Sequence, residues 1–353
     1  GQRGDFRWER RVLERPSLAF SFALGEFLVE RRQSGRIELI MAFNRNTQWR
    51  TTPELRARAM DTVEDSLHFF EELFGPYPLD QLTLVTLPRF YSQSYPGFIT
   101  LTDTVVRSVT TTDKRTMDWL RADTIAHEVS HQWWGNRLGW ASYRDQWLSE
   151  GMANYSSLLF LTRNSEKSRG ALAESSAMWR NSLTRPTLGG RTLESLGPFV
   201  LGPRLNSSLA SDGYRAIVYR KGAVVLAMLA RTIGEKQFLE MMRALAEAAD
   251  YRVISTEDFI AAIEHMSRME LTDFADRYIY GTGVPNVYYD YEVIKEPVFP
   301  RGRRKDVIAI SGQHFLPVIE FEDGSAYRAQ SQEMADTINA GKLFDHAGAQ
   351  TAT

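Results

Sequence analysis

The sequence predicts an α+β fold in which a mainly helical centre is flanked by β-rich segments. Short strand-like runs, separated by Gly, Asn and charged turns, occupy both ends of the chain and lie at 17–29, 36–43, 287–294, 307–310 and 318–321. Between these ends, helical patterns with start and stop signals follow one another. We therefore expect a central domain over residues 51–285, preceded by the last strands of a β domain (1–50) and followed by the β-rich start of another domain (286–353).

The helical centre opens with a clear helix start. Thr52 is a suitable cap, Pro53 takes the first helical position, and apolar residues recur on one face until Gly75 and Pro76 stop the helix. Further helices are expected at 116–134, from 145 onward, and at 166–183, 215–232, 235–249, 256–265 and 271–280, with strands at 82–87 and 97–101. Residues 189–213 are rich in Gly, Pro, Ser and Asn, which predicts a long surface connection.

The composition limits the class of protein. Its 43% apolar and 24% charged residues are ordinary for a globular protein, and a net charge of -2 argues against a general attraction to nucleic acid or anionic membrane. No run approaches the roughly 18 apolar residues of a membrane span. The absence of Cys excludes disulfides, thiolate metal sites and a Cys nucleophile. Both ends look cut from a longer protein, and the sequence leaves the oligomeric state and the compartment open.

The residues that carry chemistry stand in the segment His127-Glu128-Val129-Ser130-His131. On a helix, two imidazoles four positions apart project from the same face and can hold a single metal ion. Glu128 lies beside them and can reach a water molecule on that ion. A catalytic zinc site usually takes three protein ligands. Eighteen residues separate His131 from Glu150, which opens another expected helix and is the candidate third ligand. The alternative is a coincidental pair of packed histidines, and the nearby tryptophans are expected to pack in the core.

Several segments together resemble the aminopeptidase N-like family of gluzincin metallopeptidases, whose pattern is His-Glu-x-x-His, eighteen residues, Glu. They are 74–79, 97–100, the two helices with the motif and Glu150, and 218–223. The resemblance implies a thermolysin-like catalytic domain over 51–285, one Zn²⁺ per chain and a peptide substrate.

The resemblance also implies roles for single residues. His127, His131 and Glu150 would be the metal ligands, and Glu128 the catalytic acid and base. Tyr219 precedes a Lys-Gly pair and would direct its hydroxyl at the reaction centre, with Tyr214 as a second contributor. Apart from the resemblance, the position of Asn154 one helical turn beyond Glu150 makes it a candidate hydrogen-bond partner for one of the histidines, with a surface or capping role as the alternative.

One segment departs from the family pattern. Members of the family carry Gly-Ala-Met-Glu-Asn before the Gly-Leu-Ile-Thr strand, and its Glu binds the free α-amino group of the substrate. Aligned on Gly97, this chain places Ser94 at the position of that Glu and Gln93 beside it. A hydrogen bond to a charged group is worth about 1.5–3 kcal/mol, and neither side chain supplies the negative charge. Gln93, Ser94, Gly97 and Tyr214 are the candidate substrate-binding residues.

Three consequences of this departure stay open. In the first case another carboxylate, either Asp103 or one from a domain outside this sequence, would replace the missing Glu. Alternatively the enzyme would act as an endopeptidase or oligopeptidase that needs no free N-terminus. In the third case the fold would serve as a non-catalytic binding scaffold.

Overall fold

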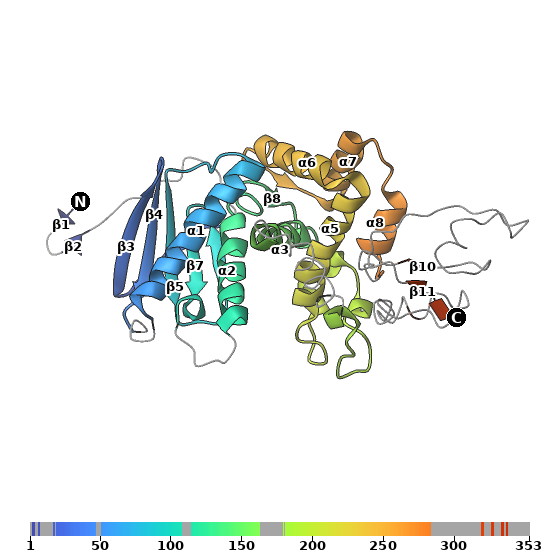
Figure 1. Ribbon diagram of the computed structural model, residues 1–353, viewed down its shortest axis with the longest axis horizontal. Helices are drawn as coiled ribbons and strands as arrows, with labels where there is room; N and C mark the ends of the chain where they lie inside the picture. The colour runs from blue at the N-terminus through green and yellow to red at the C-terminus, as the bar shows by residue number, and fades with distance from the viewer. Residues whose placement is uncertain are drawn as a thin grey trace, which may run out of the picture. The chain divides into compact units, whose positions relative to one another are not determined.

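The computed structural model describes residues 2–3, 6–7, 17, 19–46, 51–107, 114–162, 179, 181–283, 319–320, 326–327, 333–334 and 337 (Figure 1). The chain divides into two compact units, 1–288 and 289–353. The first combines a mixed sheet with a larger set of helices, which confirms the predicted α+β class. None of the helices in the described ranges combines the length and the apolar character that crossing a membrane requires.

The first unit is built on a five-stranded sheet with the order β3-β4-β5-β7-β6. Its strands are β3 (Phe27–Ser34), β4 (Ile37–Asn44), β5 (Gln81–Leu87), β6 (Gln93–Tyr95) and β7 (Phe98–Thr102). Strands β3 and β4 form a hairpin, whereas β4 pairs with β5, and β5 with β7, in parallel. The sheet therefore extends across the predicted boundary at residue 50. The short edge strand β6 lies in the segment 89–96, where the sequence predicts only a connection.

Two helices cover one face of this sheet (Figure 1). Helix α1 (Pro53–Phe74) begins as predicted, with the Thr52 hydroxyl accepting the Leu55 N–H, and ends at Gly75, whose φ of 89° suits glycine. Its buried face is mainly apolar and comprises Ala59, Met60, Val63, Ser66, Leu67, Phe70 and Phe74. Helix α2 (Lys114–Ser130) packs against α1. The tryptophans that follow α2, Trp133 and Trp134, are fully buried against Phe70 and Phe74, as expected of core residues.

Further helices in the described part of the first unit include α3 (Gln146–Thr162), α5 (Gly222–Ile233), α6 (Glu235–Ala248), α7 (Thr256–Ser267) and α8 (Thr272–Tyr278). Helix α3 contacts both α2 and α5. The helix predicted over 215–232 has two parts, because a π-helical turn η5 (Arg215–Lys221) precedes α5. The short strands β8 (Gly139–Trp140) and β9 (Val253–Ile254) pair in parallel, and the 3₁₀ turn η2 (Asp103–Val105) follows β7.

The predicted surface connection at 189–213 is wrong in part. This segment forms the 3₁₀ turns η3 (Glu194–Leu196) and η4 (Phe199–Leu205), and Glu194, Phe199 and Leu205 are buried. Apolar residues among the Gly and Pro residues draw the segment into the core, and composition alone conceals them.

Other predicted elements lie partly or wholly outside the described residues. These are most of the helix at 166–183, of which 181–184 is helical, and the strands at 287–294 and 307–310. In the second unit β10 (Ile319–Glu320) pairs with β11 (Ala326–Tyr327), and near the start of the chain β1 (Gln2–Arg3) pairs with β2 (Phe6–Arg7).

Candidate metal centre

The end of α2 presents the two histidines of the motif. The helix stops at Ser130, four residues earlier than predicted, yet the His131 N–H still donates to the His127 carbonyl at 3.3 Å. The imidazoles therefore remain one helical turn apart on one face, with their Nε2 atoms 3.1 Å from each other. The chain turns away at Gly135, where φ is 113° and a Cβ would lie only 2.4 Å from the Ser149 hydroxyl. Glycine is required there.

Glu150 reaches the same place from α3. Its Oε2 lies 3.5 Å from His127 Nε2 and 3.3 Å from His131 Nε2, and the three candidate ligand atoms all lie within 4.8 Å of one another. The packing of α3 on α2 thus brings together the three residues that the sequence predicts as ligands.

The donor set fits zinc. Two imidazole nitrogens and one carboxylate oxygen are the ligands of many hydrolytic zinc sites, which keep a further position for water. Among the described residues, Glu150 Oε2 and Glu128 Oε2 are buried and have no hydrogen-bond partner. Buried carboxylate oxygens without a partner are costly, so a cation among them would satisfy a need that the protein leaves unmet.

Mutual attraction sets the charges of this cluster. Burial disfavours the charged form of Glu150, but the two imidazoles outweigh burial and hold the pKa of Glu150 far below its usual range. Burial likewise disfavours charged His131, but the negative charge of Glu150 raises the pKa of His131 to about 9. A metal ion would supply the positive charge that favours ionised Glu150, so metal binding would compete with protonation of His131.

The orientation of His131 is fixed by residues that the sequence analysis missed. Its Nδ1 lies 2.7 Å from the Trp134 carbonyl and 3.2 Å from the Ser149 hydroxyl. With its proton on Nδ1, His131 donates to Trp134 and keeps the Nε2 lone pair for a metal. Asn154 was expected to hold a histidine, but its side chain makes no such bond within the described part of the chain. A carbonyl of the turn takes that place, and side-chain patterns give no signal for it.

The Nδ1 atom of His127 is in a different environment from the Nδ1 atom of His131. In the part of the chain that the structure describes, the buried His127 Nδ1 has no hydrogen-bond partner. Asp123 lies one turn earlier on α2, and its Oδ1 accepts a hydrogen bond from Ser157 Oγ at 2.8 Å. Burial raises the pKa of Asp123, and the Ser157 hydrogen bond and the charge of His127 oppose that rise. Asp123 is therefore electrostatically coupled to the first histidine.

Glu128 and Tyr219 are the two other groups beside the ligands. Glu128 is buried, and burial raises its pKa against the opposing charges of His127 and His131. The Tyr219 ring stacks on His127 with centroids 6.0 Å apart, and the Tyr214 ring meets Tyr219 edge-on at 5.7 Å. Burial and the charge of Glu150 raise the pKa of Tyr219, so its phenol stays protonated and can donate a hydrogen bond.

The edge strand β6 is tied to the end of α2. Ser94 Oγ accepts hydrogen bonds from Gln132 Nε2 at 2.7 Å and from Asn136 Nδ2 at 3.2 Å. The other end of the Gln132 amide accepts the Gly97 N–H at 3.0 Å. Gln93 is exposed, and its side-chain oxygen accepts a hydrogen bond from the Tyr95 hydroxyl. Gln132 directly follows His131, and this adjacency was the signal by which the sequence could have identified it.

Asp103, the alternative carboxylate, is engaged elsewhere. It is buried, forms an ion pair with Arg107, and borders a small hollow with Phe43, Asn44 and Thr86. The structure therefore gives no support for Asp103 as a replacement for the missing Glu.

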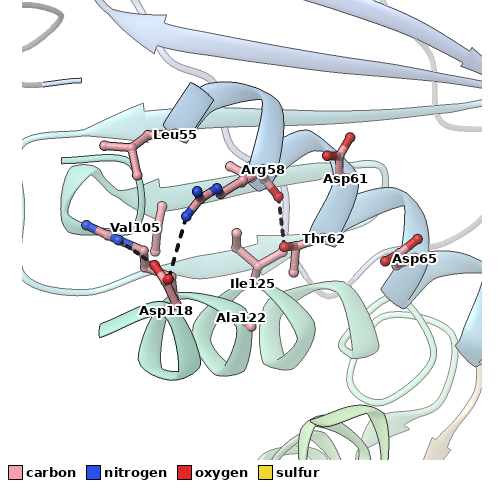
Figure 2. Close-up of a pocket in the computed structure, with 11 residues that line it drawn as sticks. Leu55, Arg58, Asp61, Thr62, Asp65, Val105, Asp118, Ala122 and Ile125 are labelled. Carbon is pink, nitrogen blue, oxygen red and sulfur yellow. Dashed lines mark hydrogen bonds and ion pairs between the residues drawn. The ribbon is translucent and has the colours of Figure 1, made fainter. Parts of the chain in front are cut away.

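A larger hollow of about 260 Å³ lies between α1 and α2 (Figure 2). Its charged groups face one another, with Arg58 3.6 Å and Arg121 3.0 Å from Asp118. No candidate metal ligand lines it. This hollow is separate from the metal centre, and its charges are used within the protein.

Comparisons with known proteins agree with this geometry. A profile of the peptidase family M1 domain matches residues 58–278. The chain is 28% identical over 235 residues to Aminopeptidase M1-B of Oryza sativa subsp. japonica, covering 65% of this chain and 26% of that protein. It is 25% identical over 297 residues to human Glutamyl aminopeptidase, covering 80% of this chain and 29% of that protein. The chain thus spans less than a third of either relative.

Solved structures show the same fold. A two-domain M1 zinc metallopeptidase mutant bound to L-arginine superposes with a TM-score of 0.54 at 19% identity, over 75% of this chain and 54% of that one. This likeness supports the predicted thermolysin-like architecture, and zinc is the metal named for that structure. Because the family profile covers more than half of the sequence, the chain belongs to peptidase family M1.

Proposed function

We propose that the protein is a zinc-dependent hydrolase of peptide bonds, of the aminopeptidase kind. The observation that carries this proposal is the convergence of His127, His131 and Glu150, with Glu128 buried beside them. The relatives named above are aminopeptidases, which supports the same class of reaction.

The roles follow from the chemistry of each group. His127, His131 and Glu150 would hold the zinc ion, which would supply Lewis-acid chemistry that lowers the pKa of water toward neutral pH. Glu128 takes a proton from the attacking water and later delivers it to the departing nitrogen, for which a carboxyl with a raised pKa is suited. Tyr219 donates a hydrogen bond to the oxygen that becomes negative as the carbonyl is attacked.

The polarity around Ser94 supports a second candidate, cleavage that needs no free α-amine. Two amide groups, from Gln132 and Asn136, donate to Ser94, and no carboxylate stands at this position. A substrate ammonium placed there would meet hydrogen-bond donors instead of a counter-charge, which is unfavourable when the group is desolvated. The alternative to aminopeptidase action is therefore endopeptidase or oligopeptidase action, in which the substrate peptide extends beyond Ser94 and has no free α-amine there.

The test is turnover of a peptide library in which each sequence is present with a free and with an acetylated N-terminus. Faster cleavage of the free peptides supports aminopeptidase action, whereas equal or faster cleavage of the acetylated peptides supports the alternative. Glu128→Gln should bind zinc at the wild-type stoichiometry and lose about 10²–10⁴-fold in kcat. If the wild-type protein binds zinc but cleaves no peptide of the library, hydrolysis is refuted. The non-catalytic binding scaffold would then be the remaining explanation.

A further inference from the structure

Lys221 and Glu194 form an ion pair that is sealed inside the first unit. Lys221 Nζ lies 2.6 Å from Glu194 Oε1, and the two side chains are 0% and 2% exposed. The same ammonium donates to the Gly281 carbonyl at 3.1 Å and lies 5.2 Å from the centre of the Phe199 ring. Burying two opposite charges often stabilises a fold no better than an apolar pair of the same size. Fold stability alone therefore does not explain the pair, and its position along the chain becomes informative.

Lys221 is the last residue of the π-helical turn η5, and Tyr219 stands two positions before it. The Gly222 N–H is shared between the carbonyl of Ile217, five residues earlier as in a π-helix, and the carbonyl of Tyr219. Such turns are rare, occur as single insertions within α-helices, and are frequent at functional sites. Because the ordinary α-helical pattern is the common alternative, contacts from outside the helix must hold η5 in its wider form.

The contacts that do so reach η5 from two sides. Tyr219 stacks on His127 at the metal centre, while Lys221 extends to η3 and to the segment after α8. Side chains two positions apart do not share a helix face, so an anchor at Lys221 fixes the rotation at which Tyr219 leaves the turn. Gly222 fixes the separation, because its backbone packs directly on Gly151 of α3.

We propose that the Glu194–Lys221 pair is a positioning device that sets the rotation of η5 and so holds the Tyr219 hydroxyl at the reaction centre. This inference rests on the proposed function, in which Tyr219 stabilises the developing oxyanion. Neither Glu194 nor Lys221 touches the substrate in this account; both act through Tyr219.

The test is a double-mutant cycle between Lys221→Met and Tyr219→Phe. Lys221→Met alone should lower kcat by about 10²-fold, the usual cost of misplacing a reacting group by about 1 Å, while KM and zinc content stay unchanged. In the Tyr219→Phe background the same substitution should lower kcat by less than about threefold, because the hydroxyl that it misplaces is already gone. Ile263→Ala is the matched control, since Ile263 is fully buried in α7 and its loss should lower the melting temperature without lowering kcat.

Hydrogen exchange provides a readout that does not depend on turnover. In Lys221→Met, with and without zinc, amides of 215–222 should exchange faster than in the wild type, whereas those of α1 should not change. Should Lys221→Met fail to fold, Glu194→Asp keeps both charges, draws the carboxylate back by one methylene, and must show the same dependence on Tyr219.

Three results would overturn the inference. These are an unchanged kcat in Lys221→Met, an equal loss in both backgrounds, or faster exchange throughout the protein. If one of these three results is found while Glu128→Gln loses hydrolysis, the proposed hydrolase function still stands. Only the positioning role of the Glu194–Lys221 pair is then refuted. A full rate in Tyr219→Phe would remove the role of Tyr219 and this inference with it.

Discussion

Replacing Gly151 by Ala tests how closely the two helices behind the metal centre approach. A Cβ on Gly151 would lie 3.0 Å from the Gly222 carbonyl carbon and 3.1 Å from its Cα, and a Cβ on Gly222 would lie 3.0 Å from the Gly151 Cα. All of these neighbours are backbone atoms, which cannot rotate away. An ordinary contact begins near 3.4 Å, so α3 and α5 must separate by about 0.4 Å.

Two opposing effects decide the stability of Gly151→Ala. Ala is favoured over Gly inside a helix by about 1 kcal/mol, whereas forcing an extra methyl into a packed core costs about 1–3 kcal/mol. We expect overpacking to win, with a net loss of stability. Glu150 lies on α3, and Tyr219 lies on η5, which continues directly into α5, so the separation also moves these two residues apart. A misplacement of 1 Å costs about 10²-fold in rate, so a shift of about 0.4 Å corresponds to a loss of kcat of roughly fivefold to tenfold.

The assay pairs thermal unfolding with kcat for Gly151→Ala, Gly222→Ala and the combined variant. Each single substitution should lower both quantities. The combined variant should lose less than the two singles together, because one separation of the helices accommodates both methyls. A rise in melting temperature for Gly151→Ala at unchanged kcat would refute the close approach and the coupling that we infer from it.

Three further predictions concern the residues around the metal. Tyr219→Phe should lose about 10²–10³-fold in kcat, the usual cost of removing one donor to the oxyanion, with unchanged zinc content; a loss below about threefold would contradict its role. In the metal-free protein the pKa of His131 is raised from 6.5 to about 9, so its contribution to stability is complete below about pH 6.5 and is lost as the pH rises through 9. Thermal unfolding of the metal-free protein should therefore give a lower melting temperature at pH 10 than at pH 6, and His131→Gln should reduce this difference; an equal difference in the variant would count against the assignment. Asp123→Asn should weaken zinc binding by about 10–100-fold in competition with a chelator, since the carboxylate acts on His127 from outside the ligand set, and wild-type affinity would show that Asp123 only packs against Ser157.

The parts of the site that the sequence could predict are local or follow a fixed spacing. Helical periodicity alone places His127 and His131 on one face, and the spacing of the family pattern that the sequence resembles points to Glu150. Apolar residues at helical spacing likewise predict α1 together with its cap and its end.

The parts that the sequence could not predict depend on contacts between distant segments. Strand β6 has only three residues and is defined by its pairing with β7, which gives no periodic signal. The π-helical turn η5 has the same apolar pattern as an α-helix. Glu194 and Lys221 are far apart in the sequence, and a charged residue in a Gly- and Pro-rich segment normally indicates solvent exposure, whereas packing in the fold buries it here.

The most direct test of the central claim is a crystal structure of the zinc-loaded protein with anomalous data collected at the zinc edge. We predict one anomalous peak per chain, about 2.0–2.1 Å from the Nε2 atoms of His127 and His131 and about 2.0–2.2 Å from a carboxylate oxygen of Glu150. Zinc bound elsewhere, or zinc held by the two histidines while Glu150 points away, would contradict it.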